Sequence, residues 1–448
     1  MHSITDKAEQ ALARAEALGE ERHRIFIELD AARILERARA LDALDADEAR
    51  ALPLFGRLIS LKDLVDEAGQ RTTAGSQILQ KREPASANAA VVDRLLAAGA
   101  VPFGRTNMTE FAYSGVGLNP HHGTPGAIHD RAVIPGGSSS GAAMSVARGI
   151  CDAAICTDTG GSARIPAAIN GLYGIKPTAA SVSLAGVHPL STRFDSVGLL
   201  AGSLELAMDV LNAIRNEPLP SITTADTPAA PLRFAMAPRQ MLSDLAADVA
   251  ADFDRTLEVI LAAGHAVREI DLPEVADAVE GMKMLVSAEA RAFYASDMDE
   301  IDTRSDPNVV ARLHLADDET PESLAKAAAM REKAIEAAGS ALAAYDALLS
   351  PTIPFAPPRI TEVENDFTTW NGRMLSLCSL INLFDGCGVS LPLRRGSETQ
   401  AATNPESSPA TRQAWFGAVM LAGPQGRDER LLRAARRIDR LIATKHFS

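Results

Sequence analysis

The sequence predicts an open α/β sheet protein, and three observations support this fold class. Short apolar runs typical of buried strands alternate with glycine-rich turns and helical segments between residues 54 and 178. The chain has 448 residues, of which 46% are hydrophobic, so it can bury a large core. No Pro/Ser-rich linker interrupts residues 1–210. Open α/β sheets bind ligands at the carboxyl ends of their strands, and we expect the site there.

The first segment, residues 4–48, is helical. Apolar residues recur at helical spacing, as at Ala8, Leu12 and Ala15. This spacing predicts two or three surface helices, which either pack on the rest of the chain or form a dimer contact. We therefore expect residues 1–50 to be N-terminal helices packing on the core, and residues 51–448 to form the main domain.

Strands and helices alternate over the next hundred residues. The glycine-rich turn before residue 141 leads into a helix whose N-terminus carries the positive end of the helix dipole. A following strand leads directly into a second glycine-rich loop. The predicted elements are strands at 54–60, 100–105 and 151–157 and helices at 87–98 and 141–148.

The second half of the chain is richer in helices. Residues 244–263 and 276–346 show helical spacing and Ala-rich turns, and a mainly helical segment at about 240–346 is expected to form a pocket wall. The remaining elements are a surface connection at 216–232, a rigid proline-rich loop at 350–358, a polar mobile segment at 396–412 and an amphipathic helix at 428–444.

Two glycine pairs, each followed by a serine, are the most distinctive feature of the chain. They read Pro-Gly-Gly-Ser-Ser-Ser-Gly at 135–141 and Asp-Thr-Gly-Gly-Ser-Ala-Arg at 158–164, which places Ser138 and Ser162 24 residues apart. Such runs mark places where the backbone approaches a ligand closely. Neither run has the Gly-Lys of a phosphate loop or the Gly-x-Gly-x-x-Gly of a dinucleotide site. Two ordinary turns with solvated serines are the remaining alternative.

These motifs resemble those of the amidase signature family of serine hydrolases. The resemblance covers residues 54–66, 104–112 and 135–178, and it continues at 349–354 and 422–428. It implies a large mixed, mostly parallel open sheet flanked by helices on both faces. It also implies a catalytic triad in which Ser162 is the nucleophile, Ser138 follows a cis peptide bond, and Lys62 is the general base.

The chemistry of this triad requires an uncharged lysine. A serine hydroxyl is a weak nucleophile that needs a base within hydrogen-bond reach, and none of the nine histidines lies in a glycine-framed motif. Lys62 follows the apolar run 58–61, and burial there would lower its pKa from about 10.4. Neutral Lys62 would take the proton of Ser138, which would take that of Ser162. The alternative is an ion pair between Lys62 and Asp63 or Asp66.

The glycine loop offers an oxyanion hole, because glycines allow backbone N–H groups to converge. We expect those donors on Thr159, Gly160, Gly161 and Ser162. The expected supporting residues are Gly137 in the first turn, Ser139 and Ser140 orienting the relay through hydrogen bonds, Asp158 accepting hydrogen bonds from its loop, and Arg164 tying that loop together. Arg164 could instead anchor a substrate carboxylate, and Ser140 stands where the family often has glycine.

The substrate is less defined than the chemistry. Met108 and Tyr113 are weak candidates for the acyl pocket, with Met108 equally acceptable as core filler; Glu289, Arg291 and Trp370 are further candidates with a structural alternative. Amides, aryl amides, carbamates, ureas and dicarboxylic monoamides all offer the required carbonyl. The rival functions are the glutaminase-type subunit of a tRNA-dependent amidotransferase and a non-catalytic binding protein.

The composition of the chain restricts its expected binding partners and cellular location. The formal net charge of −14 opposes non-specific binding to nucleic acid. The N-terminus lacks a signal-peptide pattern, and no run of about eighteen apolar residues suggests a membrane span. The four cysteines show no zinc-site spacing and are expected to be buried thiols. We therefore expect a cytoplasmic enzyme that needs no metal or cofactor, acts on a small amide and could form a homodimer.

Overall fold

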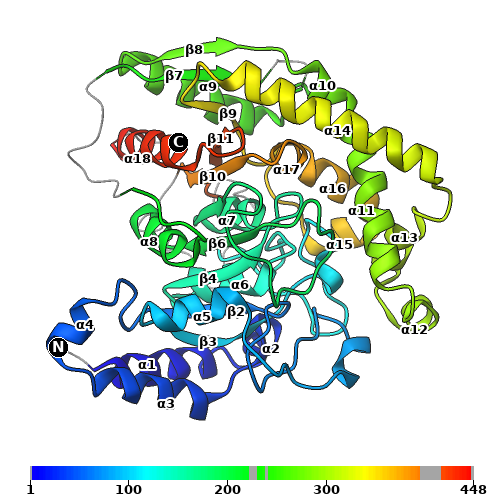
Figure 1. Cartoon of the computed structure of the whole chain (residues 1–448). Coiled ribbons are helices and arrows are strands. Elements are labelled where there is room, and N and C mark those ends of the chain that lie inside the picture. Colours follow the sequence, from blue (N-terminus) through cyan, green and yellow to red (C-terminus); the bar gives the residue numbers. More distant parts are fainter. Residues whose placement is uncertain (1–2, 221–229, 238–240, 394–414, 445–448) are drawn as a thin grey trace.

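One large mixed sheet organises the computed structural model, which describes residues 3–220, 230–237, 241–393 and 415–444. Within these residues the sheet has eleven strands and runs from the N-terminal helices at one end of the molecule to β7 and β8 at the other (Figure 1). In spatial order the strands are β1 (Phe26–Glu28), β3 (Val101–Thr106), β2 (Leu58–Lys62), β4 (Ala153–Thr157), β6 (Val197–Ala201), β5 (Tyr173–Lys176), β10 (Cys387–Pro392), β11 (Ala418–Gly423), β9 (Ala347–Pro351), β7 (Arg233–Met236) and β8 (Ala266–Glu269).

The pairing directions correct one detail of the sequence analysis. The large mixed sheet with flanking helices is confirmed. Among the described strands, however, four of the ten pairings are parallel (β2 with β3 and β4, β7 with β8 and β9) and six are antiparallel. The expectation that most strands run parallel is wrong, because β5, β6, β10 and β11 pair antiparallel through the centre of the sheet.

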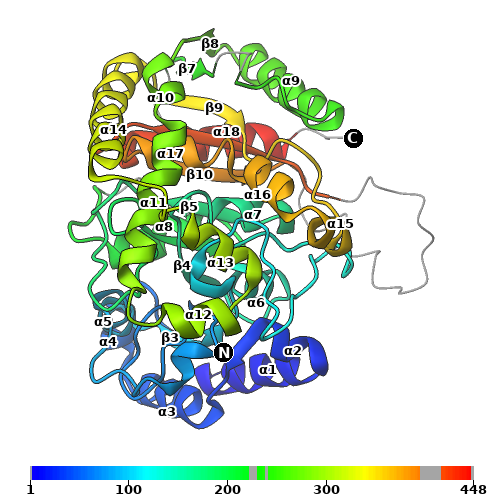
Figure 2. The same cartoon turned by 90° about the vertical axis from the view of Figure 1, so that its right-hand side faces the viewer.

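Helices surround this sheet on both sides (Figures 1 and 2). In Figure 2, α11, α12 and α13 lie in front of the central strands. The helices are α1 (Ile4–Glu16), α2 (Glu20–Ile25), α3 (Ala31–Asp42), α4 (Ala46–Arg50), α5 (Ala90–Ala97), α6 (Ser140–Ala147), α7 (Arg164–Asn170), α8 (Leu204–Ile214), α9 (Ala247–Ala262), α10 (Pro273–Asp277), α11 (Val279–Phe293), α12 (Met298–Arg304), α13 (Pro307–His314), α14 (Pro321–Leu342), α15 (Ile360–Asn365), α16 (Phe367–Leu375), α17 (Ser379–Leu383) and α18 (Asp428–Ala443), with 3₁₀ turns η1 (Ile78–Lys81) and η2 (Glu110–Ala112).

Strand β4 shows how the two faces are covered. Its side chains alternate between two hydrophobic clusters: Ala153 and Ile155 belong to the main core, whereas Ala154 and Cys156 belong to a second cluster. Because successive strand residues point to opposite faces, the two clusters lie on opposite sides of the sheet. The second cluster includes the buried faces of α1, α3 and α6, so the N-terminal helices share a core with the sheet.

The segment 396–412 lies outside the described residues, as does most of the connection at 216–232. Among the helices described here by their bounds, none combines the length and the apolar character that a membrane span requires. All four cysteines are buried free thiols, as expected.

Candidate active site

Lys62 is the last residue of β2, and its side chain is fully buried. Strand alternation points it to the same face as Ser60, whose hydroxyl contacts Ser145 of α6 at 2.8 Å. The side-chain nitrogen Nζ of Lys62 lies 2.7 Å from Ser138 Oγ and 3.1 Å from Thr157 Oγ1. The structure therefore brings together the lysine and the first of the two serines.

The neighbouring carboxylates do not pair with this lysine. Asp63 accepts Arg105 Nε at 2.8 Å, and Asp66 accepts the Thr72 hydroxyl at 2.6 Å. The alternative of an ion pair between Lys62 and Asp63 or Asp66 is wrong. Burial lowers the pKa of Lys62 to about 8, although nearby Cys156, Asp195 and Asp158 act in the opposite direction. A lysine with this pKa exchanges its proton readily near neutral pH.

Ser138 is held by its backbone. The peptide bond from Gly137 to Ser138 is cis, as the family resemblance implies. The Ser138 carbonyl accepts the Thr109 N–H at 3.0 Å, and the Gly137 N–H donates to the Gly115 carbonyl at 2.9 Å. A Cβ added at Gly137 would lie 2.6 Å from the backbone nitrogen of Gly117, so only glycine fits there. Gly137 thus supports the site by permitting this close backbone approach.

Ser162 lies in the loop between β4 and α7, and its residue surface is 4% exposed. The loop is shaped by the fully buried Asp158, as expected. Its carboxylate accepts the N–H groups of Gly161 at 2.8 Å and Ala163 at 3.1 Å. It also binds Arg164 through Nη2 at 2.8 Å and Nε at 3.0 Å. Arg164 is completely buried and engaged on this carboxylate, so it ties the loop together and is not exposed to a substrate.

The loop leaves backbone donors unused beside Ser162. Gly161, one of the four expected donors, already donates its N–H to Asp158. In the part of the chain that the structure describes, the N–H groups of Thr159, Gly160 and Ser162 make no hydrogen bond. Three N–H groups are therefore available to an oxygen placed near the serine.

Comparison with known proteins assigns the family. A family model described as Amidase matches residues 6–432. The chain belongs to the amidase family. Members of this family hydrolyse C–N bonds of amides, and this chain is accordingly an amidohydrolase.

Three proteins similar in sequence or structure can be compared with this amidase. The 2-amino-5-chloromuconic acid deaminase of Comamonas testosteroni is 28% identical over 93% of this chain and 88% of its own length. A glutamyl-tRNA(Gln) amidotransferase subunit of Nitratidesulfovibrio vulgaris is 35% identical over 65% of this chain and 61% of its own length. A crystal structure described as an amidase is 28% identical and has a TM-score of 0.84, covering 99% of this chain and 97% of that one.

Asp195 is a site residue of this amidase that the sequence did not reveal. Its fully buried carboxylate accepts the Thr159 hydroxyl at 2.5 Å and the N–H groups of Leu190 and Ser191 at 2.9 and 3.1 Å. Burial raises the pKa of Asp195 to about 6, against the opposing effect of these hydrogen bonds. Asp195 thereby fixes the side chain of Thr159, the first of the three residues whose backbone N–H groups are free. Asp195 stands among Ser191, Thr192, Arg193 and Ser196 in the sequence, so no local pattern marked it as a buried carboxylate.

The other residues proposed from the sequence for the relay or the substrate pocket are buried or bound to neighbouring side chains. The Ser139 hydroxyl is buried beside the Cys156 thiol, and the Ser140 hydroxyl is buried without a hydrogen-bond partner among the described residues. Their expected orienting role stays a prediction. Met108 is completely buried in the main core. The further candidates hold other elements in place: Glu289 accepts Ser191 and Arg193, Arg291 lies 3.4 Å from Asp317, and Trp370 stacks edge-on against Phe355.

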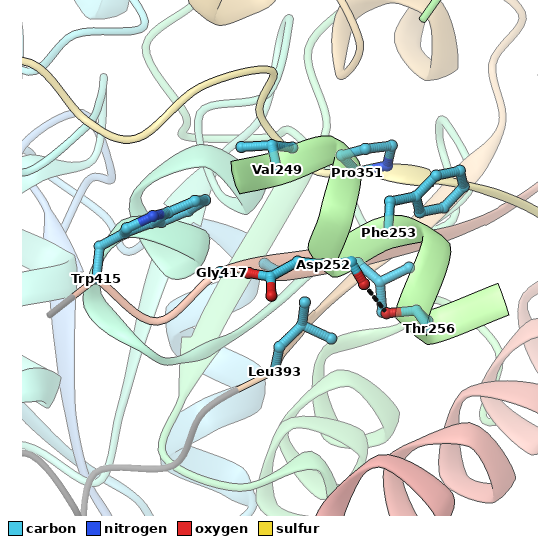
Figure 3. Close-up of a pocket in the computed structure, with 10 residues that line it drawn as sticks. Val249, Asp252, Phe253, Thr256, Pro351, Leu393, Trp415 and Gly417 are labelled. Carbon is cyan, nitrogen blue, oxygen red and sulfur yellow. Dashed lines mark hydrogen bonds between the residues drawn. The ribbon is translucent and has the colours of Figure 1, made fainter. Parts of the chain in front are cut away.

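A separate hollow lies between α9 and the strands β9 and β11 (Figure 3). Val249, Phe253 and Trp415 line it, and the Thr256 hydroxyl on its wall donates to the Asp252 carbonyl at 2.8 Å. Three strands, β6, β5 and β10, separate β11 from β4 in the sheet. This hollow is therefore distinct from the site around Lys62.

Proposed function

We propose that this amidase cleaves the C–N bond of a small amide-type substrate through a covalent acyl intermediate on Ser162. The observation that carries the proposal is the buried contact of 2.7 Å between Lys62 Nζ and Ser138 Oγ. Neutral Lys62 accepts the proton of Ser138, Ser138 accepts that of Ser162, and Ser162 Oγ attacks the carbonyl carbon. Lys62 is suited to this step because its burial holds a fraction of the amine uncharged near neutral pH.

The oxygen of the tetrahedral intermediate would then be stabilised by backbone donors. The proposed oxyanion hole consists of the N–H groups of Thr159, Gly160 and Ser162, with Gly161 shaping the turn through its φ of +129° and its bond to Asp158. The protonated relay returns a proton to the leaving nitrogen as the C–N bond breaks. Water then attacks the acyl ester, and Ser162 recovers its proton.

Two observations favour a self-sufficient hydrolase over the amidotransferase subunit. The match to the deaminase spans 93% of this chain, whereas the match to the amidotransferase subunit spans 65%. That deaminase acts, by its name, on a small organic acid. Hydrolysis of small amides by the purified chain alone would support our proposal, and ammonia release from glutamine only with added partner subunits would favour the alternative.

Covalent labelling of Ser162 tests the proposal directly. A fluorophosphonate reagent should modify Ser162 of the purified protein, as located by mass spectrometry of its peptides. The Ser162→Ala variant should not react, whereas Ser203→Ala, which alters only the exposed N-cap of α8, should react like the wild type. Labelling of a different serine, or of none, would contradict the proposed nucleophile.

Asp195→Asn is expected to lower kcat by on the order of tenfold with little change in KM, because the amide group no longer fixes Thr159 as the carboxylate does. Thr159→Val, which removes the hydroxyl but keeps the backbone N–H, should change kcat in the same direction. Steady-state kinetics on one amide substrate checks both variants. A lower melting temperature with an unchanged kcat in both would show that this contact serves stability alone.

A further inference from the structure

Arg312 of α13 is a cation without an acidic partner in the part of the chain that the structure describes. Its guanidinium carbon lies 4.3 Å from the centre of the Tyr113 ring, and its Nε is buried without a hydrogen bond. Among the described residues, no hydrogen bond or ion pair reaches this guanidinium. The buried arginines Arg105 and Arg164, in contrast, each bind a carboxylate. Burial lowers the pKa of Arg312, and the neighbouring Tyr113 acts in the opposite direction.

Tyr113 belongs to a segment that is bound to the backbone at Gly137 and Ser138. The segment 109–117 runs against the cis peptide at two points, because the Thr109 N–H donates to the Ser138 carbonyl and the Gly115 carbonyl accepts the Gly137 N–H. Tyr113 lies between these two contacts. The two residues before it, Phe111 and Ala112, have backbone φ angles of +53° and +61°, which residues other than glycine rarely adopt. Such backbone strain is most common at functional sites.

Glu110 fixes the arginine and the tyrosine relative to one another. Its buried carboxylate accepts the Asp306 N–H at 2.7 Å and the Ser305 hydroxyl at 3.0 Å, where α13 begins. The same residue opens the turn that leads to Tyr113. The stacked pair is therefore preorganised by one anchor.

Contacts through α11 link α13 to the loop that carries the free N–H groups. Helix α13 packs against α11, as Figure 2 shows. Glu289 of α11 accepts the Ser191 hydroxyl at 2.7 Å, and Ser191 donates its N–H to Asp195, which holds Thr159. The helix that carries the guanidinium and the loop that carries the free N–H groups are thus linked through α11, Ser191 and Asp195.

We propose that Arg312, stacked on Tyr113, binds a carboxylate carried by the substrate, so that this enzyme acts on small amides bearing a carboxylate, such as monoamides of dicarboxylic acids. The inference rests on the proposed function. A planar guanidinium matches a carboxylate with two parallel hydrogen bonds, and the substrate would supply the counter-ion that the described residues do not provide. A neutral substrate would leave this partly buried guanidinium without a counter-ion.

Binding to the inactive Ser162→Ala variant tests the subsite without turnover. Isothermal titration calorimetry would compare malonate, succinate and glutarate with the corresponding diamides. At least one diacid should bind on the order of 10- to 100-fold more tightly than its diamide. This preference should disappear in Ser162→Ala/Arg312→Gln and persist in Ser162→Ala/Arg304→Gln, which removes an exposed arginine of the neighbouring helix.

The outcomes separate the subsite from the proposed function. Equal affinity for diacids and diamides, or a preference that survives Arg312→Gln, would overturn the carboxylate subsite, while labelling of Ser162 would still stand. Arg312→Gln removes a cation without an ion-pair partner, so its melting temperature should equal or exceed that of the parent. If Arg312→Gln did not fold, Arg312→Lys would serve instead, since it keeps the charge but loses the planar fork and should weaken diacid binding.

Discussion

Ser162→Ala is expected to abolish amide hydrolysis, lowering kcat by on the order of 10⁴-fold or more. The reason is that alanine leaves no oxygen to form the acyl intermediate, while Lys62, Ser138 and the free N–H groups remain in place. The melting temperature should stay close to that of the wild type, because Ser162 makes no structural hydrogen bond that alanine would break among the described residues. Initial rates of ammonia release, with Ser203→Ala as the matched control, check this result.

Retention of more than about one-hundredth of the wild-type kcat in Ser162→Ala would contradict the acyl-enzyme route. Background hydrolysis by a contaminating amidase is separated from this outcome by repeating the assay after fluorophosphonate treatment. The wild type should lose activity in proportion to labelling of Ser162.

Lys62→Met is expected to cause the second-largest loss, on the order of 10³-fold in kcat for amides and less for esters of the same acyl group. Methionine fills a similar volume but accepts no proton, and a leaving amine needs the returned proton more than a leaving alcohol does. The folded protein should be no less stable, because the substitution removes an amine whose burial lowers its pKa to about 8.

Matched assays of amide and ester substrates check the effect of Lys62→Met. Lys81→Met, which alters an exposed lysine paired with Asp297, is the control for loss of a positive charge. Equal losses for amides and esters would mean that Lys62 does not return the proton to the leaving group. A fall in melting temperature large enough to account for the lost activity would assign Lys62 a structural role.

The pairing of Lys62 with Ser138 could be predicted because the motifs that contain both residues resemble those of the amidase signature family. The strand directions could not be predicted from the sequence, because central strands covered on both faces are apolar whether they run parallel or antiparallel. The orientation of the Gly161 N–H depends on Asp158, and no composition rule fixes which side of a loop each amide faces. The role proposed for Arg312 could not be predicted from the sequence. Its distinguishing property is that no described carboxylate pairs with it, and only the folded structure reveals this.

The central claim is that an uncharged amine at Lys62 activates Ser162 through Ser138. The rate constant for fluorophosphonate labelling of Ser162, measured against pH at constant ionic strength, tests it most directly. Since the amine must be deprotonated, the rate should rise with pH in a one-proton transition near the lowered pKa of about 8, and Lys62→Met should remove this transition. A midpoint near 10.5, the ordinary value for lysine, or the same profile in Lys62→Met, would contradict the claim.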